Sequence, residues 1–106
     1  MTSYGETATT VGCAAGLEDR DVIFPQYREQ GTFLWRGYTL EEIINQCMGN
    51  SRDAAKGRQM PVHYGSPKLN LVTVSSPLTT QVPQASGAGY AFRTAGDDRV
   101  AATYFG

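Results

Sequence analysis

The feature that most constrains this chain is a nearly continuous apolar run from Val100 to Phe105. Such a run, without polar alternation, is typical of a strand that is covered on both faces in a parallel sheet. A second short run, Val22 to Phe24, is closed by Pro25, and a third extends from Leu71 to Val74. Because helical patterns separate these runs, we predict an α/β fold with a parallel sheet flanked by helices.

The clearest helical pattern covers the residues from Thr39 to Met48. Thr39 and Glu42 form a capping box at its start, and Gly49 is suited to end it. Apolar residues at i, i+3, i+4, i+7 and i+8 predict one buried stripe, formed by Leu40, Ile43, Ile44, Cys47 and Met48. Further helices are predicted over 2–17, over 27–35 with a break at Gly31 or an end at Gly37, and from Thr79 or Thr80 to about Arg93 with Gly96 behind it.

Composition narrows the class of protein. The 106 residues fit one domain or part of one, and Lys+Arg 9 against Asp+Glu 10 argues against a nucleic-acid binder. Charged residues make up 18%, below the roughly 25% of an average domain, so we expect part of the surface to be covered by something else. No apolar run is long enough to span a membrane, and Cys13 and Cys47 are expected to be free thiols.

Two segments carry groups suited to binding an anion. Gln26 to Glu29 follows a predicted strand, where the Tyr27 hydroxyl, the Arg28 guanidinium and the amides of a helix start could hold phosphate oxygens. The alternative there is an ordinary pair between arginine and a carboxylate. A long polar loop extends from Asn50 to Lys68, and within it the run from Lys56 to Gly65 combines two cations with His63. That combination suits an anion or a reacting carbonyl group, and the alternative is a solvated basic loop.

A third segment, Ser75 to Gln81, is dense in oxygen donors. Its hydroxyls, backbone carbonyls and side-chain amide could together hold a hard cation. The alternative is a polar turn followed by a helix cap.

In this order, the segments resemble one family. The runs Phe24-Pro25-Gln26-Tyr27-Arg28-Glu29, Lys56-Gly57-Arg58-Gln59-Met60-Pro61-Val62-His63-Tyr64-Gly65 and Ser75-Ser76-Pro77-Leu78-Thr79-Thr80-Gln81 resemble the alpha subunit of the branched-chain 2-oxo acid dehydrogenases, their thiamine diphosphate-dependent decarboxylating component. The resemblance covers essentially the whole chain. One departure is Ala54-Ala55, where the family tends to have Leu-Gly, and that change could restrict the loop backbone.

The resemblance implies a role for each matching residue. Tyr27 and Arg28 would bind the cofactor's diphosphate, Gln26 would lie near the substrate, and Ser76 and Leu78 would contact the aminopyrimidine. A structural potassium ion would be bound by Ser75, Pro77, Thr80 and Gln81. The family's magnesium ligands and catalytic histidine would follow Gly106, and the activating glutamate belongs to the beta subunit. We therefore expect residues 1–106 to be a partial thiamine diphosphate-binding domain, truncated at both ends and inactive alone.

The resemblance also implies a function for the intact enzyme. It would oxidatively decarboxylate branched-chain 2-oxo acids and transfer the acyl group to lipoyl groups of a multienzyme complex in the mitochondrial matrix. Its partners would be the beta subunit, in an alpha2-beta2 heterotetramer, and the lipoyl-bearing acyltransferase core, with no nucleic acid and no membrane. Two alternatives stay open: a pyruvate or acetoin dehydrogenase alpha subunit, and a non-catalytic truncated fragment that only binds partners.

Overall fold

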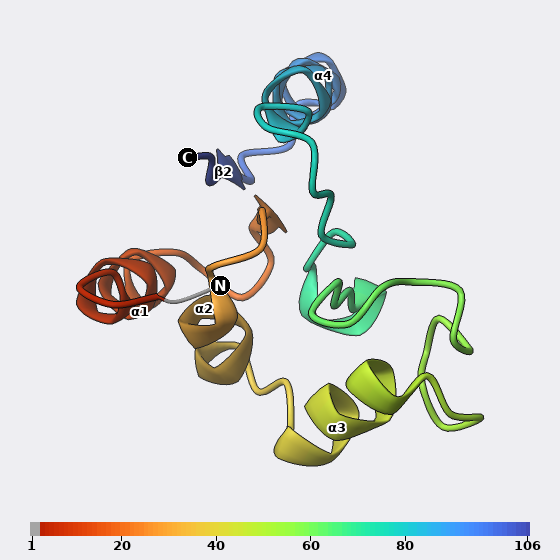
Figure 1. The fold of residues 1–106 in the computed structure, drawn as a ribbon. Helices are drawn as coiled ribbons and strands as arrows, with labels where there is room; N and C mark the ends of the chain where they lie inside the picture. Colours follow the sequence, from red (N-terminus) through yellow and green to blue (C-terminus); the bar gives the residue numbers. More distant parts are fainter. Residues whose placement is uncertain (1–2) are drawn as a thin grey trace.

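The computed structural model describes residues 3–106, so Thr2, at the start of the first predicted helix, lies outside the described residues. The elements are α1 (Thr7–Ala15), β1 (Val22–Phe24), α2 (Gln30–Trp35), α3 (Leu40–Met48), a 3₁₀ helix (Pro67–Leu69), α4 (Gln81–Ala95) and β2 (Ala101–Thr103). Figure 1 shows the two strands side by side, with α4 on one side of them and α1 and α2 on the other. The α/β class predicted from the sequence is confirmed.

The two strands are neighbours in the sheet and pair in parallel, as the predicted parallel sheet requires. Val22 lies opposite Ala101, and Phe24 lies opposite Thr103. The third predicted strand is wrong in its extent, because of its residues only Leu71 forms bridges, a parallel one to Ile23 and an antiparallel one to Ser66. The Val72 amide still donates to the Ile23 carbonyl at 2.9 Å, but the amide two residues later bonds to a different segment. There the Val74 amide donates to the Tyr64 carbonyl at 2.8 Å, which draws the chain away from the sheet.

The apolar run that predicted a fully covered strand is only half-buried. All three residues of β2 are of intermediate exposure, and the flanking Val100 and Phe105 are 49% and 59% exposed. Helix α4 packs against β2 and also contacts β1. The run predicted a strand that is covered on both faces. Within residues 3–106 that coverage is incomplete, and β2 is less buried than the central strand of a full sheet would be.

The hydrophobic core lies between β1, α2, α3 and the segment that follows the long loop. Its buried members are Ile23, Phe33, Tyr38, Ile43, Tyr64, Leu71 and Val74. The ring centroids of Phe33, Tyr38 and Tyr64 lie 5.4 to 5.6 Å apart, and the rings meet in the edge-on or tilted geometries that aromatic pairs prefer. The core thus fastens the long loop to the sheet.

Helix α3 begins as predicted but does not bury the predicted stripe. The Thr39 hydroxyl accepts from the Glu42 amide, the Glu42 carboxylate accepts from the Thr39 amide, and Gly49 ends the helix with a φ of 60°. Of the five stripe residues only Ile43 is buried, and Cys47 is half-buried. The other three are exposed: Leu40 by 69%, Ile44 by 60% and Met48 by 75%. The helix touches the core along one narrow line, and its remaining apolar surface faces outward.

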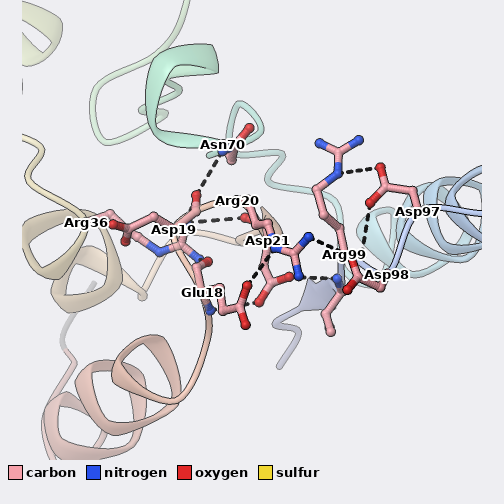
Figure 2. A network of polar contacts seen from close by, with 10 residues as sticks. Glu18, Asp19, Arg20, Asp21, Arg36, Asn70, Asp97, Asp98 and Arg99 are labelled. Atoms are coloured by element: carbon pink, nitrogen blue, oxygen red, sulfur yellow. Dashed lines mark hydrogen bonds and ion pairs between the residues drawn. The ribbon is translucent and has the colours of Figure 1, made fainter.

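A network of polar contacts joins the amino ends of the strands (Figure 2). The buried Asp21 carboxylate accepts from the Val100 amide at 2.7 Å and from the Glu18 amide at 2.8 Å, so it ties β2 to the turn before β1. Arg36, only 7% exposed, donates to backbone carbonyls of that same turn. The network fixes the strands at the end opposite to their carboxyl termini.

Apolar side chains are plentiful on the surface, which is consistent with the low content of charged residues. The large exposed ones are Tyr4, Leu34, Trp35, Leu40, Ile44, Met48, Met60, Leu78, Tyr90, Val100 and Phe105. Across residues 3–106, none of the helices combines the length and the apolar character needed to cross a bilayer. Both cysteines are free thiols, as predicted.

Candidate functional site

A cavity of about 300 Å³ opens at the carboxyl ends of both strands. The residues that line it follow β1 (26–29), end or follow β2 (103–106), or belong to α1 and the residue before it. In open α/β sheets this edge is the ordinary place for a ligand. Gln26, Tyr27 and Arg28, which the sequence singled out, all line this cavity.

Gln26 lines the cavity and carries a buried hydrogen-bond donor without a partner. Its side chain is 2% exposed, and its Oε1 accepts from the Gly106 amide at 2.8 Å, which joins the ends of the two strands. The amide nitrogen Nε2 is buried and has no hydrogen-bond partner within the described residues. A buried donor without a partner is costly, so the site is suited to a ligand with an acceptor oxygen at this point.

Arg28 lies at the rim of the cavity, and its charged group makes only exposed contacts. Its guanidinium lies over the Tyr27 ring, 5.4 Å from the centroid, and pairs with Glu6 at 3.5 Å. The carboxylate pair that we kept as an alternative is therefore present. Both side chains of that pair are more than 40% exposed, and exposed ion pairs contribute little, so an anionic ligand could take the place of Glu6.

The predicted helix start at Tyr27 is wrong. Helix α2 begins three residues later, at Gln30. The Glu29 carboxylate accepts from the Gln26 amide at 2.9 Å and from the Arg28 amide at 3.1 Å, and such local side-chain contacts compete with helix formation. These two amides are thus not available to a ligand, contrary to the expectation from the sequence.

Tyr104 is a residue of this cavity that the sequence analysis missed. Its hydroxyl is buried and has no hydrogen-bond partner among the described residues. Burial raises the pKa of Tyr104 to about 12, so the phenol is a neutral donor at physiological pH. Tyr104 belongs to the apolar run from Val100 to Phe105, which predicts a strand and gives no sign of a binding residue. Its position at the carboxyl end of that strand is the signal that could have revealed it.

The segment from Ser75 to Gln81 is organised around the Gln81 side chain, which is 1% exposed. Gln81 Nε2 donates to the Ser75 carbonyl at 2.6 Å and to the Pro25 carbonyl at 3.4 Å. The amide oxygen Oε1 is buried and lacks a partner within residues 3–106. A buried neutral oxygen with free lone pairs is suited to a cation, which is the chemistry that the sequence indicated.

Of the alternative for this segment, a polar turn followed by a helix cap, the structure contains the turn but contradicts the side-chain cap. Thr80 precedes α4, but its side chain makes no capping hydrogen bond. The Thr79 hydroxyl donates instead to the Leu78 carbonyl at 2.6 Å. Ser76, Pro77 and Leu78 are exposed and do not line the cavity. The contact of the Gln81 side chain with the Pro25 carbonyl connects this segment to the cavity residues that follow β1.

His63 is buried, although the basic residues of its loop are exposed. Lys56 and Arg58 are exposed, as the alternative of a basic loop expects, but His63 is only 6% exposed. Its Nδ1 lies 3.0 Å from the Pro61 carbonyl oxygen, and its Nε2 contacts the Ser76 hydroxyl. A lone histidine gave the sequence analysis no reason to connect these two segments.

The departure from the family at Ala54-Ala55 imposes no left-handed backbone. The non-glycine residues with positive φ are Lys56, Val62, Asn70 and Thr79, so neither alanine needs the freedom of glycine. In the part of the chain that the structure describes, no group of three or more His, Cys, Asp or Glu side chains could hold a metal ion.

Comparison with known proteins places this geometry in a family. The family model described as "Dehydrogenase E1 component" matches residues 1–106. The chain is 58% identical over 106 residues to the mitochondrial 2-oxoisovalerate dehydrogenase subunit alpha of Dictyostelium discoideum and 55% identical to that of Homo sapiens. All of this chain is covered in both matches, but it spans only 24% of each relative. The chain belongs to the dehydrogenase E1 component family.

Proposed function

We propose that this chain contributes the diphosphate-binding corner of a thiamine diphosphate-dependent enzyme that oxidatively decarboxylates branched-chain 2-oxo acids. The observation that carries the proposal is the cavity beyond β1 and β2, where Arg28, the Tyr27 side chain and the unpartnered Gln26 amide gather. The names of its relatives, subunits alpha of 2-oxoisovalerate dehydrogenase, supply the substrate class and favour it over pyruvate or acetoin.

The donor set fits a diphosphate. The planar guanidinium of Arg28 can hold two phosphate oxygens, and Tyr27 and Tyr104, which also line the cavity, carry hydroxyl groups that can donate. Glu6 is the one group that such a ligand would displace from Arg28. Gln26 lies deepest and would donate from Nε2 to an acceptor oxygen of the substrate or cofactor.

Thiamine diphosphate, when bound, supplies the carbanion stabilisation that the decarboxylation requires. The residues of this chain bind and orient it: Tyr27 and Arg28 hold the diphosphate, while Ser76 and Leu78 contact the aminopyrimidine. Leu78 is 59% exposed, as a side chain that supports a ligand from below would be before that ligand is present. Magnesium would be held by residues outside this segment.

The segment from Ser75 to Gln81 would hold a potassium ion. The buried, unpartnered Gln81 Oε1 supports this assignment, together with the Ser75 and Thr80 hydroxyls and the Pro77 carbonyl. The segment has no carboxylate, and a divalent ion would favour one. The ion would brace the turn that carries Ser76 and Leu78.

The assembly that we propose is an alpha2-beta2 heterotetramer in the mitochondrial matrix. Its beta subunit would supply the activating glutamate, and the enzyme would transfer the acyl group to lipoyl groups on an acyltransferase core. The exposed apolar side chains on α2, α3 and α4 support burial of this segment in a larger structure.

The test is to assay the intact α–β assembly with 3-methyl-2-oxobutanoate and with pyruvate, with thiamine diphosphate and magnesium present. We expect cofactor-dependent release of carbon dioxide, faster with the branched substrate. A preference for pyruvate would contradict the substrate class. No turnover with either acid, in an assembly that is shown to be folded, would favour the non-catalytic binding alternative.

A further inference from the structure

A strained turn lies directly before His63. The His63 amide donates to the Met60 carbonyl at 3.1 Å, which closes a four-residue turn with Pro61 and Val62 at its centre. Val62 has a φ of 65°, whereas Pro61 does not have a positive φ, so the turn is of type II. That position normally takes glycine, and a β-branched residue there is a true outlier with a strained backbone.

Two contacts hold the turn in this conformation. The Val62 side chain packs against the hydrophobic core. The buried Gln46 of α3 donates from Nε2 to the Met60 carbonyl at 2.7 Å. The surrounding structure therefore fixes a backbone conformation that the local sequence disfavours, as is common near functional sites.

The type II turn determines how His63 makes its hydrogen bonds. Relative to a type I turn it reverses the central peptide group, and the carbonyl of that group is the Pro61 carbonyl. This carbonyl lies 3.0 Å from His63 Nδ1, and a carbonyl only accepts, so Nδ1 carries the proton. In the neutral imidazole Nε2 is then an acceptor, and the Ser76 hydroxyl donates to it.

We propose that His63 is a positioning residue, which fixes the Ser76 hydroxyl through Nε2, and that the strained turn at Val62 sets the tautomer that makes this possible. The inference rests on the proposed function, in which Ser76 contacts the cofactor. The long loop and the segment that follows Val74 are thus joined by one directed hydrogen bond. When it is lost, the turn that carries Ser76 and Leu78 loosens.

Two substitutions separate the two nitrogen atoms of His63. In His63→Gln the side-chain amide oxygen reaches the place of Nε2 and can still accept from Ser76. In His63→Asn the side-chain amide reaches only the place of Nδ1, so the contact with Pro61 can be kept while the contact with Ser76 is lost. Both variants lose the imidazole ring, so they differ only in which nitrogen position of His63 they replace. Each variant is therefore the control for the other.

The first measurement is hydrogen exchange over residues 75–80 in the intact α–β assembly without cofactor. We expect about five- to tenfold faster exchange in His63→Asn and little change in His63→Gln. In Ser76→Ala the exchange is already fast, and adding His63→Asn should change it no further. Equal exchange in the two His63 variants, or an additive effect in the double variant, would overturn the proposal.

The second measurement is thiamine diphosphate affinity by calorimetry on the same assemblies. We expect about five- to tenfold weaker binding in His63→Asn and less than a twofold change in His63→Gln. If the unsubstituted assembly binds no thiamine diphosphate while the exchange pattern holds, the proposed function fails and the positioning role stands. If affinity responds to neither variant, His63 does not position Ser76 for the cofactor.

Discussion

Arg36 gives the sharpest test of how the strands are held together. It is 7% exposed, and its Nη2 donates to the Glu18 carbonyl at 2.8 Å while its Nη1 donates to the Asp19 carbonyl at 2.9 Å. Two further carbonyls, of Asp21 and Leu69, lie at 3.3 and 3.4 Å. Figure 2 shows Arg36 beside the turn that precedes β1. We predict that Arg36→Met, which refills much of the space but donates nothing, loosens this end of the sheet.

The size of the effect follows from the contacts. A hydrogen bond with a charged group contributes about 1.5–3 kcal/mol, so the two short ones together contribute about 3–6 kcal/mol. The Asp19 carbonyl would keep the Asn70 side-chain amide as a donor, and the Glu18 carbonyl would keep the Asp21 amide. Because neither carbonyl is left alone, the lower end applies, about 3 kcal/mol. Arg36→Lys can keep one of the two contacts and should lose about half as much.

The assay is native-state hydrogen exchange in the intact assembly, with the Ile23 and Val72 amides as probes. Both donate across the junction of β1 with the Leu71 segment. A loss of about 3 kcal/mol makes their exchange more than a hundredfold faster, and the loss in Arg36→Lys makes it about tenfold faster.

Arg20 of the same network is the matched control. Its guanidinium pairs with Glu18 and Asp98 on the surface, where ion pairs contribute little, so Arg20→Met should leave both probes nearly unchanged. Unchanged exchange in Arg36→Met, or equal effects in Arg36→Met and Arg20→Met, would refute the claim that Arg36 holds this end of the sheet together.

The remaining predictions concern a close approach and the cation. Gly65→Ala should lower the melting temperature in calorimetry by several degrees, because a Cβ there would lie 2.8 Å from the Thr73 Cα; Gly87→Ala, where a Cβ meets nothing within 4 Å, should not lower it. Potassium at about 100 times its dissociation constant stabilises by roughly 2.7 kcal/mol, so the assembly should melt higher in potassium than in sodium at equal ionic strength. Gln81→Ala should shrink that difference, and identical melting curves in both salts would show that the segment holds no potassium.

Local signals in the sequence were sufficient for most of the elements. The capping box at Thr39, the glycine after α4 and the apolar run of β1 each act over a few residues, and each is where the sequence indicated. The parallel direction of the strands followed from their alternation with helices, but that alternation did not show that β1 and β2 are neighbours. The ligand cavity at the carboxyl ends of the strands followed from the same order.

Specific contacts, some local and some between distant residues, account for what the sequence did not predict. The start of α2 is set by the Glu29 carboxylate, which takes two nearby amides, and the end of the Leu71 segment is set by Tyr64. The apolar stripe of α3 has the right period, but periodicity does not say which of its residues find a partner. The pairing of His63 with Ser76 depends on a turn that places valine where glycine is usual, and no propensity favours that choice.

The most direct test of the central claim is the affinity of the intact assembly for thiamine diphosphate, with and without the Arg28 side chain. Loss of a charge-assisted contact worth about 1.5–3 kcal/mol predicts binding that is about 10- to 150-fold weaker in Arg28→Ala, measured by calorimetry with magnesium present. Arg52→Ala is the control, since Arg52 is exposed, pairs with Glu41 and does not line the cavity, and its affinity should match that of the unsubstituted protein. Equal affinity in all three proteins would show that Arg28 serves only its pair with Glu6 and that the cavity beyond the strands does not hold the diphosphate.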